Sequence, residues 1–199
     1  MTARSPAQQL AVHVRTVLGD GPFPLPGGWT HMGAGSATPA FRRAVSTSRR
    51  SGRGLQAAWP DAATVCGFQA RLATEDLAVA MNFSSPRRVA TAHGITDLLA
   101  ASGVDTRNDF RAWLDHEASR AALLAVEGVG PKTVDYIGNL VGRSQVAVDV
   151  HLRTFAADAG VSGLKYEQLR AVYEETAVLL GHEPGGLEHA VWRFRSQSV

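Results

Sequence analysis

The glycine-rich segment Gly128-Val129-Gly130-Pro131 constrains the fold of this chain more than any other stretch. Two glycines around one apolar residue let the backbone reverse tightly, because glycine accepts a positive φ. The proline suits the first position of a following helix, where its missing N–H costs nothing. The sequence therefore predicts a helix–hairpin–helix over residues 123–141. Exposed hairpin amides beside a helix N-terminus can bind a phosphate without a positive side chain.

Composition limits what this hairpin can belong to. The chain has 199 residues, 45% of them apolar, and a net charge of only +2, which permits a nucleic-acid partner without demanding one. The single cysteine, Cys66, excludes an intramolecular disulfide, a four-thiolate iron–sulfur cluster and a cysteine-rich zinc site. We see no secretory signal and no apolar run long enough to span a membrane, so we expect a cytoplasmic protein.

Lys132, directly after the hairpin, is unusual for this chain. Of the 20 basic residues 18 are arginine, and Lys132 and Lys165 are the only lysines. A lysine can lose its proton and act as a nucleophile, whereas an arginine effectively cannot. The residue type at 132 therefore favours chemistry over simple charge, with chance as the alternative.

Helical periodicity dominates the rest of the chain, and no run alternates as a strand does. We expect an all-α fold with an extended piece at 146–148 and Asp149 as a helix N-cap. The predicted helices cover residues 6–18, 40–47, 60–73, 86–102, 108–114, 117–126, 131–141, 150–157, 165–180 and 187–195, and residues 74–76 cap a further short helix that ends at 81.

The motif GVGPKT followed by VDVH resembles the helix–hairpin–helix/Gly-Pro-Asp superfamily of base-excision DNA glycosylases. The resemblance implies two helical lobes with the active-site cleft between them. One lobe would comprise residues 29–145 and end in the hairpin, and the other would combine residues 1–28 with 146–199. It further implies a monomer that acts on DNA containing a damaged or modified base or an abasic site. Iron–sulfur-bearing branches of the superfamily are excluded by the cysteine count.

By resemblance, Lys132 would attack C1′ of an extruded nucleotide while Asp149 assists, giving glycosylase and AP-lyase activity through a Schiff base. The helix dipole at the start of the second hairpin helix disfavours an ammonium on Lys132, and partial desolvation in a cleft would act in the same direction. Asp149, as an N-cap, is favoured as a carboxylate.

The resemblance also assigns residues around this pair. Tyr136 lies one helical turn after Lys132, where it can stack on an everted base, although a core tyrosine is an equal alternative. The remaining assignments are DNA-backbone contacts from Gly128, Val129, Gly130, His151 and Arg153, a base-pocket contribution from Trp192, and a structural monovalent or calcium ion on the carbonyls of Leu124, Val126 and Val129. No cofactor is required.

Other features of the sequence leave alternatives open. Core packing is an alternative role for Trp192 and Phe194, and a surface position is one for His151. One group of arginines could form a basic arm that contacts DNA phosphates, or could equally be solvated charges on a loop: Arg42, Arg43, Arg49, Arg50 and Arg53. The segment GSATPA carries Ser36 and Pro39 where relatives hold a polar wedge.

Two other functional hypotheses compete with the bifunctional glycosylase. A monofunctional glycosylase would use Asp149 to activate water. A non-catalytic helix–hairpin–helix protein would only hold nucleic-acid backbone, with Lys132 as one more phosphate contact.

Overall fold

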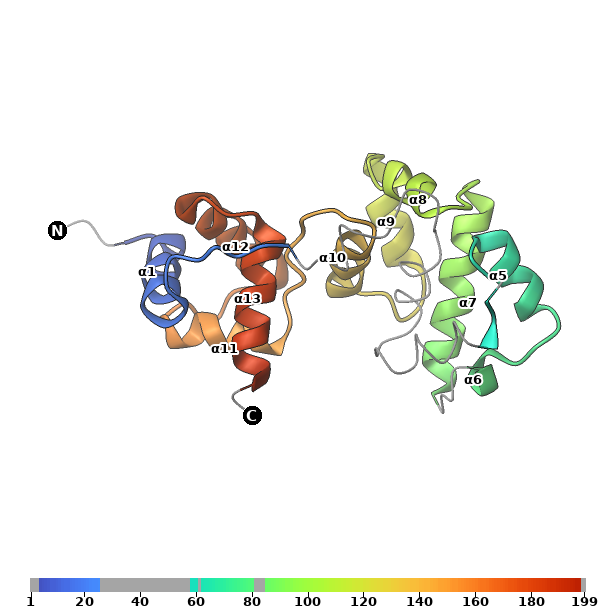
Figure 1. The fold of residues 1–199 in the computed structure, drawn as a ribbon, viewed down its shortest axis with the longest axis horizontal. Coiled ribbons are helices and arrows are strands. Elements are labelled where there is room, and N and C mark those ends of the chain that lie inside the picture. The colour runs from blue at the N-terminus through green and yellow to red at the C-terminus, as the bar shows by residue number, and fades with distance from the viewer. Residues whose placement is uncertain (1–3, 26–57, 61, 81–84, 198–199) are drawn as a thin grey trace. The chain divides into compact units, whose positions relative to one another are not determined.

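A computed structural model of the chain describes residues 4–25, 58–60, 62–80 and 85–197 (Figure 1). Within these ranges all regular secondary structure is α-helical, which confirms the predicted all-α class. The helices are α1 (Pro6–Leu18), α5 (Val65–Leu72), α6 (Leu77–Ala80), α7 (Pro86–Ala101), α8 (Arg107–Trp113), α9 (Glu117–Ala125), α10 (Pro131–Leu140), α11 (Val150–Asp158), α12 (Tyr166–Leu180) and α13 (Pro184–Gln197). In these described ranges no helix is both long and apolar enough to cross a bilayer.

Two predicted helix starts are wrong. We expected a helix from residue 60, but α5 begins at Val65, where Thr64 caps it by accepting from Gly67 N. Asp105, from a distant part of the chain, fixes this start because its carbonyl and carboxylate oxygens accept from Val65 N and Cys66 N at 3.0 and 2.8 Å. The last helix begins at Pro184 rather than at residue 187.

Glycines at the start of α13 explain the second error. Helix propensity argues against Gly185 and Gly186, since each glycine costs about 1 kcal/mol relative to alanine. The backbone of Phe23, however, crosses this turn so closely that a Cβ on Gly186 would lie 2.1 Å from the Phe23 carbonyl oxygen. The glycines are there for packing, which helical periodicity does not reveal.

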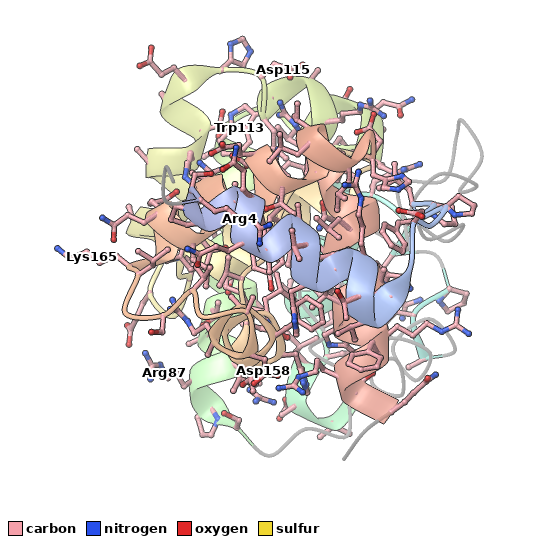
Figure 2. The ribbon with its side chains drawn as sticks, turned by 90° about the vertical axis from the view of Figure 1, so that its left-hand side faces the viewer. Arg4, Arg87, Trp113, Asp115, Asp158 and Lys165 are labelled. Atoms are coloured by element: carbon pink, nitrogen blue, oxygen red, sulfur yellow. The ribbon has the colours of Figure 1, made fainter. Side chains whose placement is uncertain are left out.

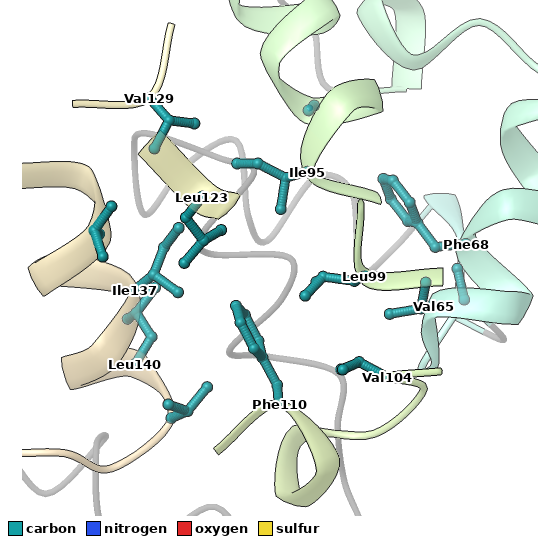
Figure 3. Packing of buried hydrophobic residues seen from close by; sticks show 14 of the residues in the cluster. Val65, Phe68, Ile95, Leu99, Val104, Phe110, Leu123, Val129, Ile137 and Leu140 are labelled. Atoms are coloured by element: carbon teal, nitrogen blue, oxygen red, sulfur yellow. The ribbon is translucent and has the colours of Figure 1, made fainter. Parts of the chain in front are cut away.

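The chain divides into two compact units, the first made of residues 1–30 and 144–199 and the second of residues 31–143. In the second unit the described helices α5 to α10 enclose one apolar core. Figure 3 shows Leu123 of α9 meeting Ile137 of α10, with Phe110 beside them. The two helices that flank the predicted hairpin are therefore part of the core and are held by it.

The first unit joins α1 to the three last helices. Helix α1 packs along α12, where the Thr176 hydroxyl donates to the Ala7 carbonyl oxygen at 3.3 Å. The core of this unit includes Leu10, Phe155 and Tyr173, all fully buried. Its edge is polar: Lys165, the N-cap of α12, extends away from the ribbon (Figure 2).

Candidate functional site

A short hairpin connects α9 to α10, as the sequence predicts. Val126 ends α9, and Val129 N donates to the Val126 carbonyl oxygen at 3.0 Å to close the turn. Gly128 has the positive φ that the reversal needs, +83°. Gly130 does not: its φ is −111°, an ordinary extended value for an N-cap residue, so the prediction that both glycines supply a positive φ is wrong for Gly130.

The hairpin is anchored from beneath by α7. Thr91 Oγ1 lies 2.9 Å from the carbonyl oxygens of both Arg87 and Glu127, so it links its own helix to the hairpin. A Cβ on Gly128 would lie 2.2 Å from this hydroxyl. One turn along α7, Gly94 leaves room for Val126, since a Cβ there would lie 2.8 Å from Val126 Cγ1. The position of the hairpin is thus set by close backbone packing.

Some backbone amides at the start of α10 are paired within the helix and others are not. Thr133 N and Val134 N donate to the Gly130 carbonyl oxygen at 2.9 and 3.1 Å. Among the described residues no acceptor is paired with Gly130 N or Lys132 N. A Cβ on Gly130 would meet no atom within 4 Å, so the described residues around it would leave room for a larger side chain. Together with the dipole of α10, these amides form an arrangement suited to an anion.

Lys132 and Tyr136 share one face of α10. Lys132 occupies the second position of the helix, and its Nζ lies 5.8 Å from the centroid of the Tyr136 ring, within cation–π range. Tyr136 is half-buried and packs against the core of its unit, and its role in stacking on a base stays a prediction. Lys132 itself is exposed, so its own unit does not supply the desolvation that the sequence led us to expect.

Asp149 begins α11 in the other unit. It is the N-cap, as predicted, and one carboxylate oxygen accepts from His151 N at 2.9 Å and from Leu152 N at 3.1 Å. The two bonds satisfy two of the amides at the start of α11 that have no partner within the helix. The buried Tyr173 hydroxyl donates to the Leu152 carbonyl oxygen at 2.7 Å. Burial raises the pKa of Tyr173, and the negative charge of Asp149 raises it further.

Three aromatic rings gather where α11 packs on α13. His151 of α11 meets Trp192 of α13 edge-on, with ring centroids 6.4 Å apart, and His189 stacks on Trp192 at 5.9 Å with 19° between the planes. Trp192 remains 37% exposed, so it is not the fully packed core residue considered as an alternative. Phe194, in contrast, is half-buried and packs edge-on against Phe155 of the core. His189 was not identified from the sequence.

Two further predicted contacts have more ordinary surroundings. Arg153 Nη1 donates to the Leu164 carbonyl oxygen at 3.1 Å, so part of this guanidinium ties α11 to the segment before α12. For the carbonyl cation site, Val126 O already accepts from Val129 N, Leu124 is exposed and Val129 is buried. The described residues hold no cluster of three or more His, Cys, Asp or Glu side chains suited to a metal.

Asp135 and Arg120 were missed by the sequence reasoning. Asp135 lies on α10 and is 1% exposed, and Arg120 Nη1 of α9 donates to its Oδ1 at 2.7 Å. The available signal was the placement of a charged residue, Asp135, between the apolar positions Val134 and Ile137. Thr91 gave no comparable signal, because its role depends on a contact distant in sequence.

Several predictions concern residues outside the described ranges. These are the helix over 40–47, the arginines Arg42, Arg43, Arg49, Arg50 and Arg53, and the wedge segment with Ser36 and Pro39.

The protein is all-α, with a glycine hairpin fixed on the core of one unit and Asp149 as the N-cap of α11 in the other. The segment from α7 to α13 carries every described candidate residue. The same segment is the one that a family model matches. The chain belongs to the family described as "Domain of unknown function (DUF8548)", whose model covers residues 81–196. The curated proteins and the solved structures give no match to the chain.

Proposed function

We propose that the protein is a base-excision DNA glycosylase with AP-lyase activity, in which Lys132 is the nucleophile and Asp149 its assisting carboxylate. The proposal includes the helix–hairpin–helix/Gly-Pro-Asp fold and its interlobe cleft, and DNA with a damaged or modified base or an abasic site as substrate. The observation that carries it is the hairpin at the start of α10. Lys132 is one of two lysines among 20 basic residues, and it lies at a helix start where Gly130 N and Lys132 N have no acceptor among the described residues and are suited to a phosphate.

The hairpin supports binding to a nucleic-acid backbone. Packing does not require a glycine at position 130, because a Cβ there would meet no atom within 4 Å. The missing side chain instead leaves room for a phosphate to approach the amides of Gly130 and Lys132. The amides bind phosphate without reading bases, so this contact would position the strand and not select a sequence. Lys132, one residue into the helix, then lies beside the bound strand.

The surroundings of Asp149 support its role as a carboxylate. Two amide donors hold one oxygen and leave the other free to accept a proton or to stabilise positive charge on a sugar. His151 and the exposed Trp192 lie on the same unit, where a phosphate contact and a stacking surface for a base would serve the same nucleotide.

The neutral Lys132 amine attacks C1′, the N-glycosidic bond breaks, and the base leaves with the bonding electrons and takes up a proton. The amine loses a proton to Asp149, the C1′–O4′ bond opens with protonation of O4′, and an imine joins Nζ to C1′. Loss of a C2′ proton then expels the 3′ phosphate by β-elimination, and water hydrolyses the imine.

Borohydride trapping tests this proposal directly. Wild-type protein mixed with an oligonucleotide that contains an abasic site is expected to give a stable covalent adduct on reduction of the imine. Lys132→Ala should give none, and Lys132→Arg should give none while it still binds the oligonucleotide. A wild-type protein that binds the abasic DNA without forming an adduct would contradict the lyase chemistry.

The exposure of Lys132 favours a second candidate function, that of a non-catalytic hairpin that only binds the nucleic-acid backbone. In that case Lys132→Arg retains nearly full affinity and wild type forms no adduct. The monofunctional alternative is favoured by the cap geometry of Asp149 alone. It predicts base release by Lys132→Ala and none by Asp149→Asn.

A further inference from the structure

Helix α10 carries a buried charge that the proposed chemistry does not use. Asp135 lies three residues after Lys132 and is 1% exposed. A carboxylate in an apolar core is costly unless it is paired, and even a paired one often adds no stability over an apolar pair of the same size. Stability alone is therefore a weak reason for this residue.

One partner of Asp135 comes from the other hairpin helix. Arg120 Nη1 donates to Asp135 Oδ1 at 2.7 Å, and the Arg120 side chain is 34% exposed. This ion pair joins α9, which leads into the hairpin, to α10, which leaves it. Thr91 fixes the hairpin between them through Glu127. The turn that carries Lys132 is thus held on both sides by directional bonds.

Hydrogen bonds fix the rotation of α10 about its axis more sharply than apolar packing does. Val134, Ile137 and Leu140 hold α10 against its unit and set its buried face, but apolar burial has no preferred direction and only weakly resists small rotations of the helix about its axis. A short charge-assisted hydrogen bond tolerates far less. Because Lys132 is about one turn from Asp135, any rotation of this part of α10 moves the base of the lysine side chain as well.

We infer that Asp135 and Arg120 form a positioning pair, which fixes the direction in which α10 presents the Lys132 amine to the sugar. The inference rests on the proposed function. It assigns to the pair a role in the rate of the covalent step and none in DNA affinity, which belongs to the hairpin amides.

The test replaces both members of the ion pair with uncharged residues. The double variant Asp135→Asn/Arg120→Met removes both charges with little change in side-chain volume, and Arg120→Lys keeps the charge but loses the planar fork. Asp115→Asn is the matched control, because it removes an ion pair of the same unit, Arg143–Asp115, whose aspartate side chain is 69% exposed. For each full-length variant, thermal unfolding, affinity for the abasic oligonucleotide and the single-turnover rate of borohydride trapping are measured.

We expect the double variant to unfold near the wild-type temperature and bind with wild-type affinity, and to trap about 10- to 100-fold more slowly, the loss that a misplaced reacting group causes. Arg120→Lys should show an intermediate rate, and Asp115→Asn the wild-type rate. If the double variant fails to fold, Arg120→Lys decides by the same measurements.

Two results overturn the inference, and they are distinguishable. Wild-type trapping rates in the folded double variant, or in Arg120→Lys if the double variant is unfolded, would show a purely structural pair and leave the proposed function intact. Absence of any adduct with wild type would remove the proposed function and this inference together.

Discussion

The hydroxyl of Thr91 lies 2.9 Å from the carbonyl oxygen of Glu127 and so holds the hairpin on helix α7. The same hydroxyl occupies the space that a side chain at Gly128 would need. One threonine therefore both supports the hairpin and excludes every residue but glycine from its tightest position. Gly130, two residues further on, is under no such restriction.

The two hairpin glycines should respond differently to alanine. Gly128→Ala combines a positive φ with a clash and is expected to lower the free energy of unfolding by about 1–3 kcal/mol. Gly130→Ala changes only the N-cap and should cost less than about 1 kcal/mol. Urea denaturation of both variants checks this difference, and equal losses would contradict the assigned geometry.

If the protein binds DNA as we propose, Gly130→Ala should nevertheless weaken that binding. Its new Cβ would project into the open space through which a phosphate would reach the amides. We expect a lower affinity for an abasic oligonucleotide at fixed salt, with secondary structure unchanged by circular dichroism. Unchanged affinity in a folded variant would place the backbone contact elsewhere.

Thr91→Val keeps the shape of the side chain and removes its hydroxyl. The loss of the bond to Glu127 is expected to cost about 1 kcal/mol of stability. Because the hairpin is then held less firmly, amide hydrogen exchange over residues 126–130 should accelerate more than that over α12, which lies in the other unit. A uniform change across both units would argue against a local anchor.

Asp149→Asn separates capping from chemistry. Asparagine caps helices as well as aspartate, so stability should change by less than about 0.5 kcal/mol, whereas Asp149→Ala should lose about 1 kcal/mol. If the carboxylate assists the reaction, both variants lose base release and only the alanine variant loses stability. Thermal unfolding and a glycosylase assay on the same samples make the comparison.

The raised pKa of the buried Tyr173 leads us to expect a loss of stability at alkaline pH. Burial, with the Asp149 charge second, raises the pKa of Tyr173 in the folded state, so folding favours the neutral phenol. The contribution is complete below the pKa of an unfolded tyrosine, about 10, and is lost as the pH rises above that value. The free energy of unfolding should fall less steeply above this pH in Tyr173→Phe than in wild type, as followed by urea denaturation across the pH range.

Local sequence signals predicted much of the fold. Pro131 after a glycine turn, Asp149 before an apolar run and the periodicity of residues 6–18 each correspond to an observed helix start. These features act within one or two helical turns of the chain. They also identified Lys132 and Tyr136 as neighbours on one helical face.

Features that depend on distant residues were not predictable in this way. The start of α5 depends on Asp105, the glycines of α13 on Phe23, and the hairpin on Thr91. The Arg120–Asp135 pair likewise becomes visible only when two helices are brought together. Periodicity describes the faces of a helix but not what each face contacts.

The pairing of α1 with α12 has a consequence for synthesis on the ribosome. Ala7 emerges long before Thr176, its hydrogen-bond partner, and the whole of the second unit is translated between them. Since domains fold as their residues become available, the inserted unit can acquire its core while α1 waits without its partner helix. The discontinuous unit is thus the last to be completed, and a nascent chain arrested before α12 would carry a folded hairpin and an unpaired first helix.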